Sequence, residues 1–348
     1  MIEQLPLSAN FLIFILAATT TWFAGSKLST YGVVIGDRLN ISHSILGFFV
    51  VAAATSLPEL VITITGALKG DAALVLNDMF GGISMQTAII AIADMLAVSA
   101  PITYFAFHSS LLLEAALLIL VLSFTLAIIF IKDFLIIGWV GLGALLVTSL
   151  YILCIFVLHR YEADKQWIPI EIPEQAKDKI AKVQGVWLEQ KRPLKDLVML
   201  FILFTFLVLG ASLVLVSTAI NIASQTGLGS SFIGSTLLAA TTSLPELSVT
   251  ITAVSMGAYS MAISNIFGSN MIMFALVLPA EVFYHQGAIL QEADKSAIYA
   301  IISGIFLTAI YLAGLLLRDR TSFLRMGIDS ILVLVFYLLT FVAFYHFR

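Results

Sequence analysis

The sequence contains few charged residues, few prolines and a single cysteine. Only 11% of its 348 residues are charged, against about 25% in an ordinary soluble domain, while 60% are hydrophobic and the mean hydropathy is +1.06. This composition excludes an ordinary soluble globular protein and indicates a chain that crosses a membrane many times. The net charge of −4 averages over both sides of that membrane, so it identifies no partner.

The single cysteine and the lack of N-terminal positive charge exclude two further features, an internal disulfide and a cleaved signal peptide. The single cysteine, Cys154, cannot form an internal disulfide, and its apolar surroundings favour a small buried or lipid-facing residue. The N-terminal segment MIEQLPLSAN has no Lys or Arg before the first apolar run. A cleaved signal peptide has a basic n-region, so we expect the first apolar run to be a retained span.

Enzyme motifs are also missing from the sequence. It has no Walker loop, no H-E-x-x-H and no G-x-S-x-G, and its five histidines are scattered toward predicted loops and ends. We therefore expect a protein that is not an enzyme, with no cofactor and no nucleic-acid partner.

Long apolar runs predict an all-α membrane protein with ten spans, because a spanning helix needs about 20 apolar residues. The runs give a span count of ten, although short joints leave nine or eleven open. The ten expected spans are 8–30, 43–68, 72–98, 104–131, 134–158, 197–222, 229–256, 259–284, 294–317 and 324–346.

Positive charge predicts the orientation of these spans. With ten spans, 13 of the 17 Lys and Arg fall on one side and 4 on the side of the two termini. The positive-inside rule places the 159–196 loop in the cytoplasm and both termini outside. Ile180, Val183 and Trp187 recur at helical spacing among lysines in this loop. It is either an interfacial amphipathic helix or a plain connector.

The hexapeptide TSLPEL occurs twice, at 55–60 and 242–247. A shift of 187 residues also aligns neighbouring residues, among them Phe80 with Phe267 and Asp94 with Glu281. The chain therefore divides into a first repeat (1–158), the central loop (159–196) and a second repeat (197–348). Five spans per repeat is an odd number, so the repeats are predicted to be inverted. Inverted repeats are typical of secondary transporters with a midplane site between broken helices.

Each copy of TSLPEL combines a helix breaker with a charge. Pro58 and Pro245 each remove an N–H and so free backbone carbonyls, which are costly in hydrocarbon unless they are bound. Glu59 and Glu246 each cost at least ~2.5–3.5 kcal/mol at mid-membrane. A cation bound by these hard oxygens explains the combination. The alternative is a pair of kinked structural helices with protonated or paired glutamates.

The doubled TSLPEL and the segment SNIFGSN (264–270) resemble the calcium/cation antiporter superfamily, of which the sodium/calcium exchangers are the best-known branch. The resemblance covers nearly the whole chain. It implies that Glu59 and Glu246 bind Ca²⁺ and that hydroxyl and carbonyl oxygens help to bind Na⁺. The positions carried over for this role are Ala52, Thr55, Ser56, Ala239, Thr242, Ser243 and Ser269.

The chain departs from the family pattern in the partner spans. Gly82 stands at the family's Ser in the first repeat, and Gln86 and Met273 stand at its Asn or Asp positions. Gln86 retains an amide oxygen, while a thioether is a poor ligand for Ca²⁺ or Na⁺. Asp78 replaces an Asn and shares a helix face with Gly82 and Gln86. It either lines the approach, reaches a displaced ion, or has a structural role.

Three other acidic residues fall within or near spans. Glu114 is either an ion or proton relay or a residue near the membrane boundary. Asp94 and Glu281 are expected at solvated span ends.

The resulting functional hypothesis is a secondary antiporter in a prokaryotic cell membrane that exchanges Ca²⁺ for Na⁺ or H⁺ by alternating access. Its partners are small inorganic cations and the lipid bilayer. The alternatives are an exchanger of altered selectivity and a non-transporting sensor or partner subunit that retains the fold.

Overall fold

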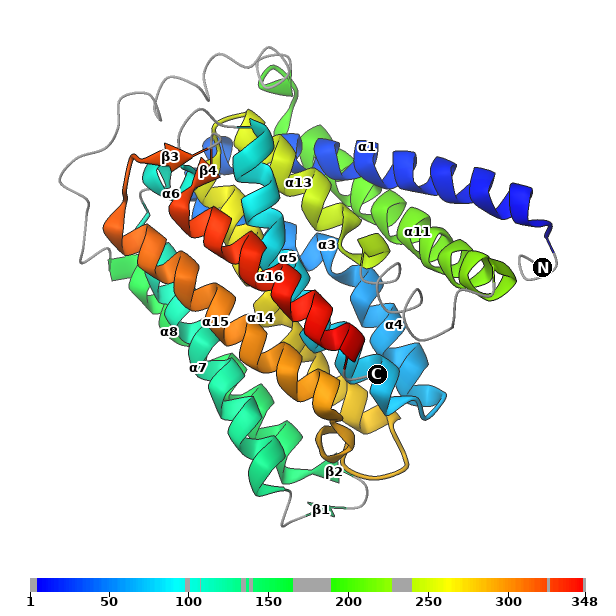
Figure 1. Cartoon of the computed structure of the whole chain (residues 1–348). Coiled ribbons are helices and arrows are strands. Elements are labelled where there is room, and N and C mark those ends of the chain that lie inside the picture. Colours follow the sequence, from blue (N-terminus) through cyan, green and yellow to red (C-terminus); the bar gives the residue numbers. More distant parts are fainter. Residues whose placement is uncertain are drawn as a thin grey trace.

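The computed structural model describes residues 5–97, 101–106, 108–132, 136–137, 140–164, 189–226, 240–323 and 326–346. These residues are mostly helical (Figure 1). The longer helices are α1 (Leu7–Leu39), α4 (Leu57–Leu68), α5 (Ala72–Ala97), α7 (Ser110–Ile131), α8 (Leu142–Asp164), α11 (Leu194–Thr226), α13 (Leu244–Ser255), α14 (Tyr259–Phe283), α15 (Lys295–Leu317) and α16 (Ile328–His346). The short helical segments are α2 (His43–Ile45), η2 (Leu46–Val51), α3 (Ala52–Thr55), α6 (Ile102–Phe105) and η4 (Ile289–Glu292).

Seven of the described helices are long and apolar enough to cross a membrane. An eighth candidate span consists of the bent pair His43–Thr55 and Leu57–Leu68, and a shorter apolar helix covers Ile328–Val342. The expected span at 229–256 falls partly outside the described residues, which contain its second half as α13. The central loop, including its expected interfacial helix, lies mostly outside them as well.

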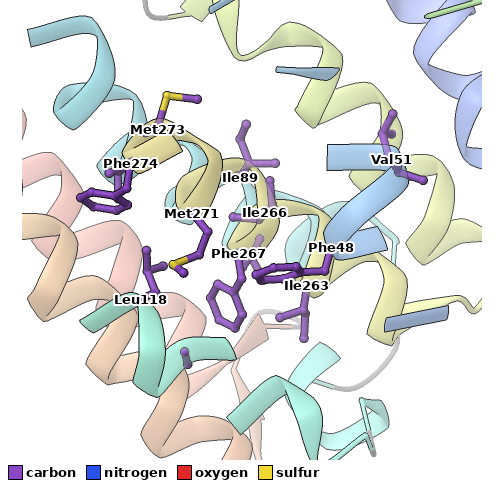
Figure 2. Close-up of a cluster of buried hydrophobic side chains, with 14 of the residues drawn as sticks. Phe48, Val51, Ile89, Leu118, Ile263, Ile266, Phe267, Met271, Met273 and Phe274 are labelled. Carbon is purple, nitrogen blue, oxygen red and sulfur yellow. The ribbon is translucent and has the colours of Figure 1, made fainter. Parts of the chain in front are cut away.

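Helix α14 forms the centre of the molecule, and 19 of its 25 residues are buried. It contacts η2, α3, α4, α5, α7, α8 and α13. The apolar cluster in Figure 2 joins Phe48 and Val51 of η2 to α14 residues such as Ile263, Ile266 and Phe267. Two glycines bring the backbones close together at this crossing. A Cβ on Gly268 would lie 2.3 Å from the Phe48 carbonyl oxygen, and one on Gly47 would lie 2.6 Å from that of Met261.

Helices α1 and α11 run side by side along one edge of the molecule (Figure 1). Apolar side chains such as Leu12, Ile15 and Leu203 are exposed on these two helices, as expected for a lipid-facing surface. Helices α7, α8, α15 and α16 pack around α14 and α5.

Two short antiparallel ribbons were not expected from the sequence. Strands β1 (Ile136–Ile137) and β2 (Val140–Gly141) precede α8, and β3 (Ser322–Phe323) and β4 (Met326–Gly327) precede α16. The ribbons occupy equivalent places in the two repeats, each before the last helix of its repeat. Two-residue strands show no alternating pattern that a sequence reading could detect.

Asp94 and Glu281 were expected to be solvated, and this expectation is wrong: both are fully buried. Asp94 accepts hydrogen bonds from the N–H groups of Ile102 and Gly327, each 2.8 Å long. Ile102 follows α5 in the same repeat, whereas Gly327 belongs to the ribbon of the other repeat. The carboxylate therefore joins the two repeats.

Glu281 makes the equivalent pair of contacts in the second repeat. It accepts the Ile289 N–H at 2.9 Å from its own repeat and the Gly141 N–H at 2.7 Å from the ribbon of the first repeat. Each repeat thus holds the ribbon of the other through one buried carboxylate. The two acids, which align when the repeats are superposed in sequence, thus make equivalent contacts in the structure. Their burial was not predicted.

Candidate functional site

Both copies of TSLPEL interrupt a helix at the same residue. Ser56 has φ −86° and ψ 7° between α3 and α4, and Ser243 has φ −82° and ψ 2° before α13. Pro58 and Pro245 follow within the first turn of the new helix, where no intrahelical partner for an N–H is needed. In the first repeat the helices on either side of the break differ in direction by 46°. The duplicated motif therefore gives two equivalent breaks.

The two glutamates are buried directly after these breaks. Glu59 is 3% exposed and Glu246 is fully buried, each in the first turn of its helix. The N-terminus of a helix carries unpaired N–H groups and a partial positive charge, which favour an anionic side chain. Among the described residues, none of the four carboxyl oxygens has a hydrogen-bond partner. A buried carboxylate without partners is costly, so these oxygens suit a bound cation or proton.

Asp78 on α5 belongs to the same electrostatic environment, because Glu59 interacts with the charges of both Glu246 and Asp78. One oxygen of Asp78 is buried and lacks a hydrogen-bond partner. Gln86, further along the same face, is 1% exposed and its amide oxygen is also unpartnered. Between them, a Cβ added to Gly82 would meet nothing within 4 Å. The α5 side of the site therefore has both open space and unused oxygens.

Hydroxyl groups from both repeats meet on the other side of the site. Thr55 Oγ1 lies 3.4 Å from Ser269 Oγ of α14, and both side chains are within interaction range of Glu246 without forming a hydrogen bond to it. The carbonyl of Ala52 accepts the Ser56 N–H at 2.9 Å and the Thr55 hydroxyl at 3.1 Å. The Ala52 carbonyl thus accepts a helical hydrogen bond and one more hydrogen bond than an ordinary helical carbonyl.

The other predicted positions have different outcomes. Ser56 and Ser243 are buried with unpartnered hydroxyls, and Thr242 is buried. Ala239 lies outside the described residues. Met273 is 1% exposed within the apolar cluster of Figure 2.

Sequence reasoning missed one polar residue near this site. Asn265 on α14 is fully buried, and neither atom of its amide has a hydrogen-bond partner among the described residues. It occupies the position equivalent to Asp78, so the duplication itself was the available signal. The two positions present an amide and a carboxylate from opposite repeats.

The oxygen set suits hard cations better than soft metals. Among the described residues, no group of three or more His, Cys, Asp or Glu side chains is close enough to hold a metal ion. Ligands beyond the carboxylates would therefore come from hydroxyl, amide and carbonyl oxygens. Such a mixed set binds a cation without enclosing it in charge, as a site that must also release the ion requires.

Comparison with known proteins identifies the family. Residues 9–159 and 197–345 match the sodium/calcium exchanger protein family. The chain belongs to the sodium/calcium exchanger family. The two matching segments are the two repeats recognised from TSLPEL, on either side of the central loop. This family member is an integral membrane cation antiporter and not an enzyme.

Relatives of this exchanger-family chain extend over most of its length. CaxA of Alkalimonas amylolytica is 26% identical over 314 residues, covering 90% of this chain and 91% of the relative. The inner membrane protein YrbG of Escherichia coli (strain K12) is 27% identical, covering 84% and 88%. The sodium/calcium exchanger MaX1 of Methanosarcina acetivorans is 32% identical over 149 residues, which is 41% of each chain.

The fold is that of the sodium-calcium exchanger NCX_Mj. A structure of that protein soaked with 2.5 mM Na⁺ and 0.1 mM Sr²⁺ matches with a TM-score of 0.71 at 19% identity, covering 97% of this chain and 99% of the other. A second structure, soaked with 10 mM Na⁺ and no Ca²⁺, gives the same TM-score at 18% identity. At this identity the likeness establishes the fold and leaves the transported ions to the site itself.

Proposed function

We propose that this antiporter exchanges Ca²⁺ for Na⁺ or H⁺ by alternating access, at a site built on Glu59 and Glu246. The observation that carries the proposal is the pair of buried carboxyls, whose four oxygens lack hydrogen-bond partners, on two equivalent helix breaks. Competition for shared carboxylates produces exchange, because the site crosses readily only when a cation or protons compensate its charge.

Asp78 is proposed to add a negative charge on the α5 side of this site, close enough to act on Glu59 but not to share one ion with both glutamates. Its charge acts on Glu59, and the empty space beside Gly82 leaves room for an ion displaced toward α5. Gln86 contributes an amide oxygen in the same direction. The remaining ligands of the proposed site are Thr55, Ser56, Thr242, Ser243, Ser269 and the carbonyls of Ala52 and Ala239.

The proposed transport cycle requires ten helices arranged as two inverted repeats. The helix order, the shared fold and the equivalent breaks support this arrangement. We further propose that the 159–196 loop is cytoplasmic and both termini are outside, in a prokaryotic inner membrane, where YrbG is named as a resident protein.

Flux into proteoliposomes tests the proposal. Purified protein is reconstituted, Na⁺ or pH gradients are imposed, and Ca²⁺ uptake is followed. We expect gradient-driven uptake that Glu59→Gln and Glu246→Gln each abolish. Glu292→Gln is the matched control, since Glu292 is an exposed acid outside the site, and its uptake should equal that of the unmodified protein.

The same assay separates the alternatives. Uptake of another divalent cation in place of Ca²⁺ would indicate altered selectivity, to which Gly82 and Met273 point. If no cation moves under either gradient, and both glutamine variants leave all cation binding unchanged, the chain is a sensor or partner subunit and the proposal fails.

A further inference from the structure

A further buried carboxyl group lies on α7, outside the residues proposed for the central site. Glu114 is 1% exposed and lies near the start of α7. Its Oε1 lies 2.7 Å from the hydroxyl of Ser44, and its Oε2 lies 2.7 Å from the hydroxyl of Ser264. The two hydroxyls are 2.8 Å apart, and Ser110 lies 2.8 Å from Ser44. Three elements, α2, α7 and α14, thus converge on one carboxyl.

The number of hydrogen atoms decides which form of the carboxyl fits this geometry. The cluster has four oxygen–oxygen contacts of 2.7–2.8 Å, and each needs a hydrogen atom between the two oxygens. Three serine hydroxyls supply three hydrogens, so an ionised Glu114 leaves one short contact without a hydrogen. A protonated Glu114 supplies the fourth hydrogen.

With a protonated Glu114, the donor and acceptor of all four hydrogen bonds can be assigned without conflict. Glu114 Oε2–H donates to Ser264, Ser264 donates to Ser44, and Ser44 donates back to Glu114 Oε1, which closes a ring. Ser110 donates to Ser44 from outside the ring. The remaining contact, between Ser264 and Oε1, is the longest at 3.0 Å and needs no hydrogen of its own.

We propose that Glu114 and these three serine hydroxyls form a second cation-binding site, separate from the central carboxyls, whose ligand is a single proton. The site is independent of which ions the central carboxyls exchange. A shift of 187 residues places Ile301 at Glu114 and Ala297 at Ser110, so the proton site is not part of the duplicated ion-binding machinery.

The position of the proton site gives it a structural consequence. Ser44 lies in α2, which directly precedes the π-helical segment η2, and π-helical segments frequently mark functional sites. Ser264 lies on α14, between Met261 and Gly268, which both contact η2 closely. The protonated ring therefore holds α7 against the crossing of η2 and α14. When Glu114 loses its proton, one of the short oxygen–oxygen contacts has no hydrogen between its two atoms. This weakens the attachment of α7 to η2 and α14.

The elements around α7 carry few charged groups that could replace this proton. The titratable and charged residues on the neighbouring elements are His43 on α2, His108 before α7, Tyr151, Cys154, His159, Arg160, Tyr161, Glu162 and Asp164 on α8, Tyr259 and Glu281 on α14, Glu292 on η4, and Lys295, Tyr299 and Tyr311 on α15. His43 is paired with Asp37 at 3.0 Å, and Glu281 holds two backbone N–H groups.

Infrared difference spectroscopy of the full chain in proteoliposomes tests the proposal. Spectra at low and high pH are compared in a Glu59→Gln/Glu246→Gln background, which removes the central carboxyls. We expect a carbonyl stretch of a protonated acid that disappears at high pH and is absent after Glu114→Gln. Glutamine resembles the protonated acid in shape and hydrogen bonding, which favours folding of that variant.

Ser264→Ala provides a second readout that does not depend on removing the acid. It should keep the band but shift it to higher frequency, because the acid loses a hydrogen-bond partner. The matched control Ser84→Ala, at a buried serine bonded to the Ala300 carbonyl, should leave the frequency unchanged. The proposal is overturned if Glu114→Gln retains every acid band, if Ser264→Ala and Ser84→Ala behave alike, or if Na⁺ removes the Glu114 band at constant pH.

Discussion

Asp78 is the residue at which this chain differs most informatively from the family pattern. Its buried oxygen has no partner, and its charge acts on Glu59. A carboxylate in this place adds charge where the neighbouring Gly82 has lost a hydroxyl. We therefore propose that Asp78 compensates in part for the oxygens that the family pattern supplies and this chain lacks.

Asp78→Asn should weaken Ca²⁺ binding about tenfold, equivalent to about 1.4 kcal/mol, because the site loses a nearby negative charge. Calorimetric titration of the purified protein measures the change. Asp71→Asn is the matched control, since Asp71 is exposed and caps the start of α5, where Asn caps about equally well. Equal affinity of the two variants would remove Asp78 from the site.

Met273→Asp is expected to strengthen Ca²⁺ binding by about tenfold. Met273 lies one turn after Ser269 on the same face of α14, and Ser269 interacts with Glu246. The new carboxylate should also lower stability without Ca²⁺, since it enters a cluster that is now apolar. Thermal unfolding with and without Ca²⁺ records both effects, with Met273→Leu as the volume-conserving control. An unchanged Ca²⁺ response would place this side chain away from the ion.

The sequence selected the candidate residues of the central site but not their surroundings in the fold. A duplicated Pro–Glu pair within apolar segments was enough to select Glu59 and Glu246. Burial of Glu114 among serines from α2 and α14 could not be predicted, because Ser44 and Ser264 are 220 residues apart. Contacts of that kind depend on how helices pack, which no local pattern records.

At the level of elements, the crossing of η2 and α14 depends on glycine. The backbones approach so closely at Gly268 that a single methyl group would meet a carbonyl oxygen rather than a movable side chain. Because η2 leads directly into the broken helix, this contact fixes the approach to Glu59. The shift of 187 residues that aligns the repeats places Gly81 at Gly268, yet only Gly268 has such a contact, since nothing lies within 4 Å of a Cβ on Gly81.

Gly268→Ala should therefore destabilise the protein by about 1–3 kcal/mol, as overpacking typically does. It should also reduce transport by displacing η2. Gly210→Ala on α11 is the control, because a Cβ there meets nothing within 4 Å and Ala stabilises a helix by about 0.5–1 kcal/mol relative to Gly. Thermal unfolding in detergent and Ca²⁺ flux measure the two effects. The crossing is less tight than described if both variants unfold at the same temperature.

The expected spans matched α5, α11, α14, α15 and α16 to within four residues, whereas α1 continues nine residues past its expected end and α8 begins eight residues late. The break of each TSLPEL helix was expected from its proline, and the structure shows it at the serine two positions earlier. Proline occupies the first turn of the second helix because its missing N–H is tolerated there. The ribbons before α8 and α16 were not predicted, because strands of two residues are too short to show an alternation of apolar and polar residues.

For the whole molecule, the duplication predicted two repeats, and the odd number of expected spans per repeat predicted that they are inverted. That inference needed only self-similarity and an odd number of spans per repeat. The likeness to NCX_Mj confirms the fold over 97% of the chain. Membrane orientation, by contrast, was inferred from loop charge alone and stays a prediction.

Cysteine labelling tests this orientation. The native Cys154 is buried, so it should contribute little background labelling, and Cys154→Ser removes it entirely. In that variant, Gln175→Cys in the central loop should react with an impermeant maleimide only in inside-out vesicles. Gln291→Cys, between α14 and α15, should react only in intact cells or right-side-out vesicles. Labelling of both from the same face would contradict the inverted arrangement.

The reciprocal contacts of Asp94 and Glu281 have a consequence for the origin and assembly of the chain. Each carboxylate accepts one N–H from its own repeat and one from the ribbon of the opposite repeat, so a single repeat would lose the second contact. An ancestral protein of one repeat would have regained this contact by pairing with a second, antiparallel copy. The present chain, cut within residues 165–188, should accordingly reassemble from two co-expressed fragments, whereas either fragment produced alone should be degraded.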